Sequence, residues 1–163
     1  MTSPFKVRYV LVSDYATVDR GGKLVIAGLY TEDLVVPSLP TLIGSLVFTV
    51  LAEPPKEKRK FRFEVESPSG LIVLGADGEI EPIPNRDGAR ARAILGFQFG
   101  QAVFNEAGEF KVFLSTPDRT ERSEIHRFRL IIDPNAGVDS PVQPTPEASP
   151  TPEHKSIRRR KAL

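Results

Sequence analysis

Four carboxylates surround two stretches that have the composition of turns: Asp14, Asp19, Glu32 and Asp33. Oxygen ligands on neighbouring loops can hold Ca²⁺, which takes about six to eight of them. The set therefore permits a divalent-metal site and a metal-dependent enzyme such as a hydrolase. Its spacing matches no calcium-binding loop, however, and aspartates commonly accept hydrogen bonds within turns. We favour turn-forming, solvated carboxylates and keep the metal-dependent enzyme as an alternative.

Asp14 and Tyr15 form a second candidate, because they lie where a strongly apolar run meets a turn. Loops on a rigid scaffold often carry binding residues, so the pair is a candidate binding site. The alternative is a buried hydrogen bond from the Asp14 side chain that ties the turn to the sheet. We favour the hydrogen bond.

Five arginines occupy the polar positions of alternating runs: Arg62, Arg90, Arg92, Arg127 and Arg129. If their strands are neighbours in one sheet, these side chains form a basic face for phosphate or for a carboxylate-rich partner. Nothing aromatic interleaves with them on that face, so base stacking has no support. Because Glu64, Glu66 and Glu124 lie in the same runs, we favour an ion-paired, solvated surface.

Two further charge runs are visible. The run at 56–60, Lys-Glu-Lys-Arg-Lys, follows two prolines and indicates a hairpin tip whose charges discourage edge pairing. Near the end of the chain Arg158, Arg159, Arg160 and Lys161 stand together. Such a cluster can attach weakly, and with salt sensitivity, to nucleic acid, an anionic lipid surface or an acidic protein.

The sequence lacks the residues that several kinds of chemistry require. There is no cysteine, which excludes disulfides, thiol nucleophiles and Cys-ligated metals and is typical of a reducing compartment. His126 is isolated from any base partner or nucleophile. The sequence has no nucleophile elbow, phosphate-binding loop or zinc-binding helix motif, and no apolar run approaches the length of a membrane span. We therefore expect no cofactor, no resident metal and no catalysis.

The apolar periodicity from residue 5 to residue 133 is two, which predicts strands. Turn signals divide this region into about eight strands, near 5–13, 23–30, 42–52, 59–67, 70–76, 89–99, 108–116 and 122–132. The pattern predicts an all-β protein, an antiparallel two-layer β-sandwich of immunoglobulin-like or jelly-roll-like form. An up-and-down barrel is the alternative. Runs that are apolar on both faces, at 9–12, 24–29 and 42–51, are expected to be central strands.

Composition changes sharply after Asp133. Residues 1–133, the expected sandwich domain, hold 17 Lys/Arg and 18 Asp/Glu, whereas residues 134–163 hold five and three. Residues 134–154 contain six prolines and few large apolar side chains, which predicts a disordered linker. Residues 155–163 form a basic C-terminal tail. The Asp77-Gly78 pair is expected to form a turn.

Two segments near the start are specific as a pair: Tyr-Val-Leu-Val-Ser-Asp-Tyr-Ala at 9–16 and Gly-Gly-Lys-Leu-Val-Ile-Ala-Gly-Leu-Tyr at 21–30. With Pro-Ser-Leu-Pro at 37–40 and the segment 104–110, the chain resembles a bacterial family of small uncharacterised proteins, catalogued as a domain of unknown function. The likeness covers roughly residues 7–132. It implies a compact β-sandwich-type domain in the bacterial cytoplasm, and it carries no assigned activity. Members often have Cys where this chain has Ser13, so no thiol role is transferred.

The leading functional hypothesis is a cytoplasmic, non-catalytic β-sandwich module that binds or assembles with another macromolecule, most simply a protein, with the tail as an auxiliary contact. Nucleic-acid association through the arginine face and tail is an alternative. Exposed edge strands would also permit a homo-oligomer, but no sequence feature decides this.

Overall fold

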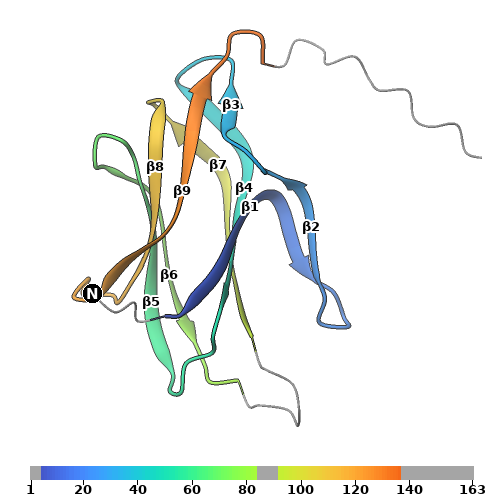
Figure 1. The fold of residues 1–163 in the computed structure, drawn as a ribbon, viewed down its shortest axis with the longest axis vertical. Coiled ribbons are helices and arrows are strands. Elements are labelled where there is room, and N and C mark those ends of the chain that lie inside the picture. The colour runs from blue at the N-terminus through green and yellow to red at the C-terminus, as the bar shows by residue number, and fades with distance from the viewer. Residues whose placement is uncertain (1–4, 84–91, 137–163) are drawn as a thin grey trace, which may run out of the picture.

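The computed structural model describes residues 5–83 and 92–136, which form nine strands and no helix (Figure 1). The strands are β1 (Val7–Val18), β2 (Leu24–Leu29), β3 (Leu34–Val36), β4 (Thr41–Ala52), β5 (Arg59–Glu66), β6 (Ile72–Ile80), β7 (Ala93–Phe104), β8 (Gly108–Ser115) and β9 (Arg122–Ile132). One sheet has the order β2-β1-β4-β7, and the other has the order β3-β9-β8-β5-β6. All pairings are antiparallel except that of β3 with β9.

The predicted all-β, two-layer architecture is confirmed, and the barrel alternative is wrong because the strands divide into two separate sheets. Phenylalanines from both sheets meet between the layers. Phe63 of β5 stacks on Phe97 of β7 with ring centroids 4.1 Å apart, and Phe48 of β4 lies 5.2 Å from Phe63. Burial of this apolar area, at about 25 cal/mol per Å², is the main force that holds the layers together.

Strand alternation places these rings as the sequence indicates. Phe61, Phe63 and Val65 are buried on one face of β5, while Arg62 and Glu66 lie on the other face. β7 runs further than expected, and Gln101 adopts a φ of 63° within the strand. After this residue Ala102 and Phe104 are again buried, so the strand continues past the predicted end at Phe99.

Three sequence-based expectations are wrong. Asp77-Gly78 forms no turn: both residues lie inside β6 and pair with Arg62 and Phe61. Glycine is required there because a Cβ at Gly78 would lie 2.4 Å from the Phe61 ring. The charged run that begins at Lys56 is not a hairpin tip, since it connects β4 to β5, which belong to different sheets.

The third error concerns the segment 24–29. It forms β2, an edge strand whose one neighbour among the described residues is β1, and not a central strand. The short strand β3 was not predicted at all. Its three residues are too few to show periodicity, and its partner β9 lies almost a hundred residues away along the chain.

Candidate binding surface

The end of β1 and the whole of β2 form a hairpin that stands apart from the five-stranded sheet, on the side away from β5 and β6 (Figure 1). We call residues 14–29 the hairpin arm. Asp19 closes its turn, since Asp19 Oδ1 accepts the N–H groups of Gly21 and Lys23, each at 2.8 Å. Gly22 adopts a φ of 78°, which glycine tolerates without strain. Asp19 thus has the turn-forming role that the sequence favours.

Asp14 anchors the base of the hairpin arm. Its Oδ1 accepts a hydrogen bond from the Tyr30 hydroxyl at 2.5 Å, and its backbone carbonyl accepts one from Ser45 Oγ of β4 at 2.6 Å. The expected tie between turn and sheet is therefore present, but the Asp14 side chain lies at the surface, and the expectation of a buried bond is wrong. The pKa of Tyr30 is raised to about 12. Burial of the phenol is the largest cause, and the hydrogen bond to Asp14 and the negative charge of Asp14 add to it.

Gly28 makes this anchor possible. It faces Asp14 across the β1–β2 ladder and adopts a φ of 64°. A Cβ at this position would lie 2.1 Å from Asp14 Oδ2. The glycine therefore supplies both the left-handed conformation and the space that the Asp14 carboxylate occupies.

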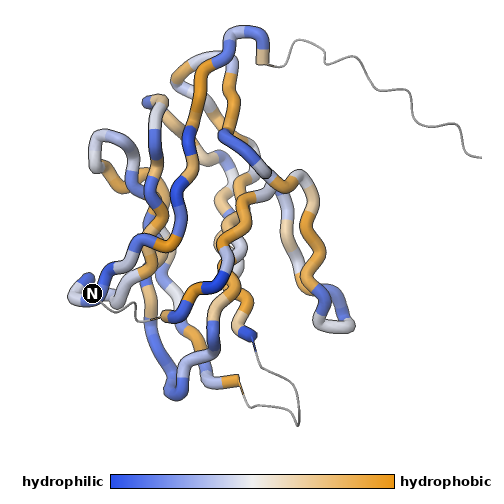
Figure 2. Tube along the Cα trace, viewed as in Figure 1, coloured by the Kyte–Doolittle hydropathy of each residue, from blue (hydrophilic) through white to orange (hydrophobic). Residues whose placement is uncertain are grey.

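Apolar side chains cover both faces of the hairpin arm. On one face Tyr15, Val25 and Leu29 are 49%, 44% and 46% exposed, and on the other face Val18 is 48% exposed. β2 has no charged residue in its sequence Leu-Val-Ile-Ala-Gly-Leu. Figure 2 shows β2 as a largely hydrophobic segment that ends in a hydrophilic turn. Tyr15 is thus part of an exposed apolar surface.

Four further exposed apolar side chains lie elsewhere in the four-stranded sheet: Tyr9 of β1, Ile94 of β7 and the paired residues Leu42 and Val103. Monomeric proteins rarely expose extended apolar patches, and such patches commonly mark interaction sites.

A small cavity of about 250 Å³ lies beside the base of the hairpin arm, lined in part by Tyr30, Glu32, Asp33 and His126. Burial lowers the pKa of His126, so its imidazole is neutral at neutral pH. Although two of the four sequence-predicted carboxylates line this cavity, no group of three or more His, Asp or Glu residues in ranges 5–83 and 92–136 is placed to hold a metal ion. The metal-dependent alternative gains no support from the described residues.

The predicted arginine face is assembled in part. Arg62, Arg127 and Arg129 occupy polar positions of β5 and β9 in the five-stranded sheet, whereas Arg92 directly precedes β7 in the four-stranded sheet. Arg127 forms ion pairs with Glu124 and, at 2.9 Å, with Glu109. The favoured ion-paired surface therefore describes Arg127, and also Arg62, which is paired with Glu64 and Asp77. Arg90 lies outside the described residues, as do Arg158, Arg159, Arg160 and Lys161.

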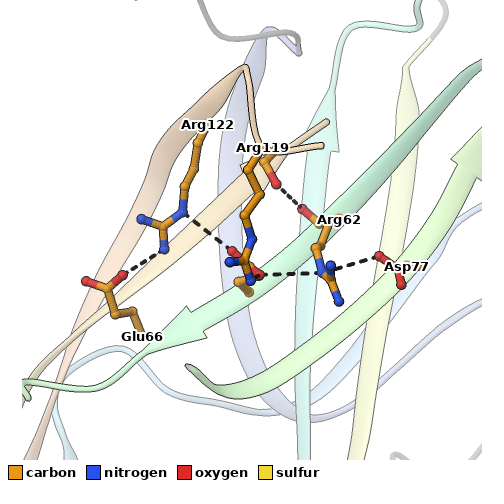
Figure 3. Close-up of polar contacts among 7 residues, drawn as sticks. Arg62, Glu66, Asp77, Arg119 and Arg122 are labelled. Atoms are coloured by element: carbon orange, nitrogen blue, oxygen red, sulfur yellow. Dashed lines mark hydrogen bonds and ion pairs between the residues drawn. The ribbon is translucent and has the colours of Figure 1, made fainter. Parts of the chain in front are cut away.

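The outward face of the five-stranded sheet contains a polar cluster around a buried carboxylate. The sequence indicates that Glu64 and Glu66 pair with arginines, but it does not indicate this burial. Glu64 of β5 is 1% exposed, although it is charged and lies on the polar side of its strand. Arg119 donates a hydrogen bond to Glu64 Oε1, Arg62 Nε lies 3.4 Å from the same oxygen, and Arg122 Nε lies 3.5 Å from Oε2. Figure 3 shows these arginines converging from β5, β9 and the β8–β9 connection.

Two features hold the arginines in place. Arg119 adopts a φ of 59°, which is uncommon for a residue with a Cβ, and its N–H donates to the Thr116 carbonyl at 2.9 Å. Arg122 stacks on Phe113, 3.5 Å from the ring centroid, and binds Glu66 at 2.7 Å. With Asp77 at 3.5 Å from Arg62, three arginines meet three carboxylates. The cluster is neutral and internally paired, which suits a structural role better than anion binding.

The residues that sequence reasoning missed are therefore those of β2, with Tyr30 and Gly28 at its base. The sequence did contain a signal: a run that is apolar on both faces indicates a central strand, or an edge strand that a partner covers.

Among the described residues, no helix has the length and apolar character that crossing a membrane requires.

Residues 8–133 match the model of a family described as a family of unknown function (DUF6941). Among curated proteins no significant match to the chain is found. The matched segment contains all nine described strands except the first residue of β1, and therefore the hairpin arm and both sheets. The resemblance expected from the opening strand and hairpin is confirmed, and the chain belongs to this family of unknown function.

Proposed function

We propose that the protein is a non-catalytic β-sandwich module that assembles with another protein, and that the hairpin arm is its docking surface. The observation that carries this proposal is the exposure of apolar side chains on both faces of the arm. The core does not explain Tyr15, Val18, Val25 and Leu29, which are all exposed.

The physical reason is the cost of leaving such an edge uncovered. An edge strand exposes unpaired N–H and C=O groups, and natural proteins usually protect it with charges, prolines or bulges. β2 has no charge or proline in its six residues. Covering its apolar side chains would release about 25 cal/mol per Å² of buried area.

The proposed setting is the cytoplasm, as the absence of cysteine favours. A non-catalytic role agrees with the internal pairing of the Glu64 cluster and with the structural hydrogen bonds of Asp14 and Asp19. Nucleic-acid association is not proposed, because Arg62 and Arg127 on the five-stranded sheet are paired with carboxylates and Arg92 lies beside the other sheet.

Affinity capture from extracts of the native host tests the docking surface. The Val25→Lys variant places a charge on the exposed face of β2, and we expect it to lose the proteins that the wild-type chain retains. Leu71→Lys is the matched control, because Leu71 is an exposed leucine, 67% accessible, in the turn before β6. Equal capture by Val25→Lys and wild type would contradict the proposal.

A further inference from the structure

The occupant of the β2 edge can be identified more closely. We infer that it is β2 of a second copy of this chain, paired antiparallel around a two-fold axis. This inference rests on the proposed docking role of the hairpin arm. Four strands from each copy would then form one continuous sheet of eight.

The geometry of β2 supports edge-to-edge pairing. Asp19 N–H donates to the Lys23 carbonyl at 2.9 Å, which makes residues 19 and 23 a hydrogen-bonded pair of the antiparallel ladder. Such pairs alternate along a ladder. In the register that aligns Val18 with Leu24 and Ala16 with Ile26, the N–H groups of Leu24 and Ile26 therefore point away from β1. A strand added at that edge would find unpaired donors and acceptors.

Charge at the two ends of β2 selects the orientation. Arg20 and Lys23 lie before the strand, and Glu32 and Asp33 follow it. All four are exposed, and within the described ranges none of them forms an ion pair with another described residue. Antiparallel self-pairing brings the basic end of each copy beside the acidic end of the other copy, twice. Parallel pairing would bring like charges together.

The symmetry also brings the apolar side chains of the two copies together. A two-fold axis makes the interface self-complementary, so the apolar side chains on each face of one arm meet the same set on the other copy. A six-residue edge is a small interface, and we expect association in the micromolar range. A strand supplied by a different protein is the alternative occupant, and the experiment below separates the two.

The test is a charge exchange followed by sedimentation equilibrium. One double variant, Arg20→Glu with Lys23→Glu, makes the segments at both ends of β2 acidic. The other, Glu32→Lys with Asp33→Lys, makes both ends basic. The Asp19 cap survives in the first variant, because it uses the backbone of residue 23 and not its side chain.

We expect the wild-type chain to dimerise and each double variant alone to dimerise about tenfold more weakly or not at all. An equimolar mixture of the two variants should recover a dimer, because each acidic end then meets a basic end. A mixture that stays monomeric, or single variants that dimerise as well as wild type, would overturn the inference. Circular dichroism of each variant establishes that it is folded.

The outcome also separates this inference from the proposed function. If the wild-type chain stays monomeric up to millimolar concentration but native capture still depends on Val25, self-pairing is wrong and a different protein covers β2. If neither self-association nor capture depends on Val25, both the inference and the proposed function are wrong.

Discussion

Glu64 shows how one side chain organises a surface. Its carboxylate is buried on the polar side of β5 because arginines from three segments cover it. A buried carboxylate costs free energy unless charged donors compensate it, so the residue and its arginines must be considered together. The run Arg-Phe-Glu-Val-Glu predicted an outward charge, but it could not predict burial, because Arg119 reaches Glu64 through a loop whose conformation is set by its own turn hydrogen bonds.

Replacing Glu64 tests this arrangement. We expect Glu64→Ala to lower the free energy of unfolding by about 2–3 kcal/mol, since three guanidinium groups lose a common partner while Arg62 and Arg119 retain access to water. Glu109→Ala is the control: Glu109 is 47% exposed, and its loss should cost about 0.5 kcal/mol or less. Urea denaturation measures both. Equal losses of unfolding free energy for the two substitutions would show that the burial of Glu64 does not strengthen its contribution to stability.

Tyr30 gives a prediction for alkaline pH. Its pKa is raised to about 12 in the folded chain, above the value of about 10 in an unfolded chain. Below pH 10 both states keep the phenolic proton and the stabilisation is complete. Between about 10 and 12 the unfolded state loses its proton first, so stability falls as pH rises.

The measurement is the free energy of unfolding as a function of pH. Tyr30→Phe should be less stable than wild type at neutral pH and should lose less stability across the alkaline window. Tyr15→Phe, which removes the hydroxyl of an exposed tyrosine in the same arm, should follow the wild-type curve. Identical alkaline slopes for Tyr30→Phe and wild type would contradict the assignment.

At the scale of elements, alternation predicts strands well and strand neighbours poorly. The run from Phe61 to Val65 identified β5 and its buried face, because period two follows from local backbone geometry. The run 24–29 was assigned to the interior, because its composition does not distinguish burial by the same chain from burial by a partner. Asp77-Gly78 was assigned to a turn, because the Phe61 ring that requires the glycine lies in another strand.

Gly28 tests the base of the hairpin arm. Gly28→Ala introduces a Cβ at a positive φ and within 2.1 Å of the Asp14 carboxylate, and we expect a loss of about 2 kcal/mol or more with faster amide exchange in β2. Gly44→Ala in β4 is the control, because a Cβ there meets no atom within 4 Å. Adding Asp14→Ala to Gly28→Ala should recover part of the loss by removing the clash. No recovery would show that the backbone conformation alone sets the cost.

At the scale of the whole molecule, ion pairs gather on the five-stranded sheet, around Glu64, whereas the hairpin arm of the four-stranded sheet has exposed apolar side chains on both faces. The sequence predicted the sandwich but not the location of these two features, since it depends on which strands share a sheet.

Truncation tests whether residues 137–163 contribute to the fold or to self-association. A chain that ends at Ala136 retains every described strand and the bond from Asp133 N–H to the Val36 carbonyl. We expect it to melt within about 2 °C of the full chain and to self-associate equally well. A lower melting temperature or weaker association would place residues 137–163 in the fold or in the interface.

The most direct test of the central claim is amide hydrogen exchange of Leu24 and Ile26, measured in dilute and in concentrated solutions of the wild-type chain. Pairing of β2 with a second copy predicts that both amides, which face away from β1, exchange more slowly as concentration rises. Val112 in the centre of the five-stranded sheet should be protected equally in both solutions. Fast exchange of Leu24 and Ile26 at every concentration would contradict the claim that a second copy covers this edge.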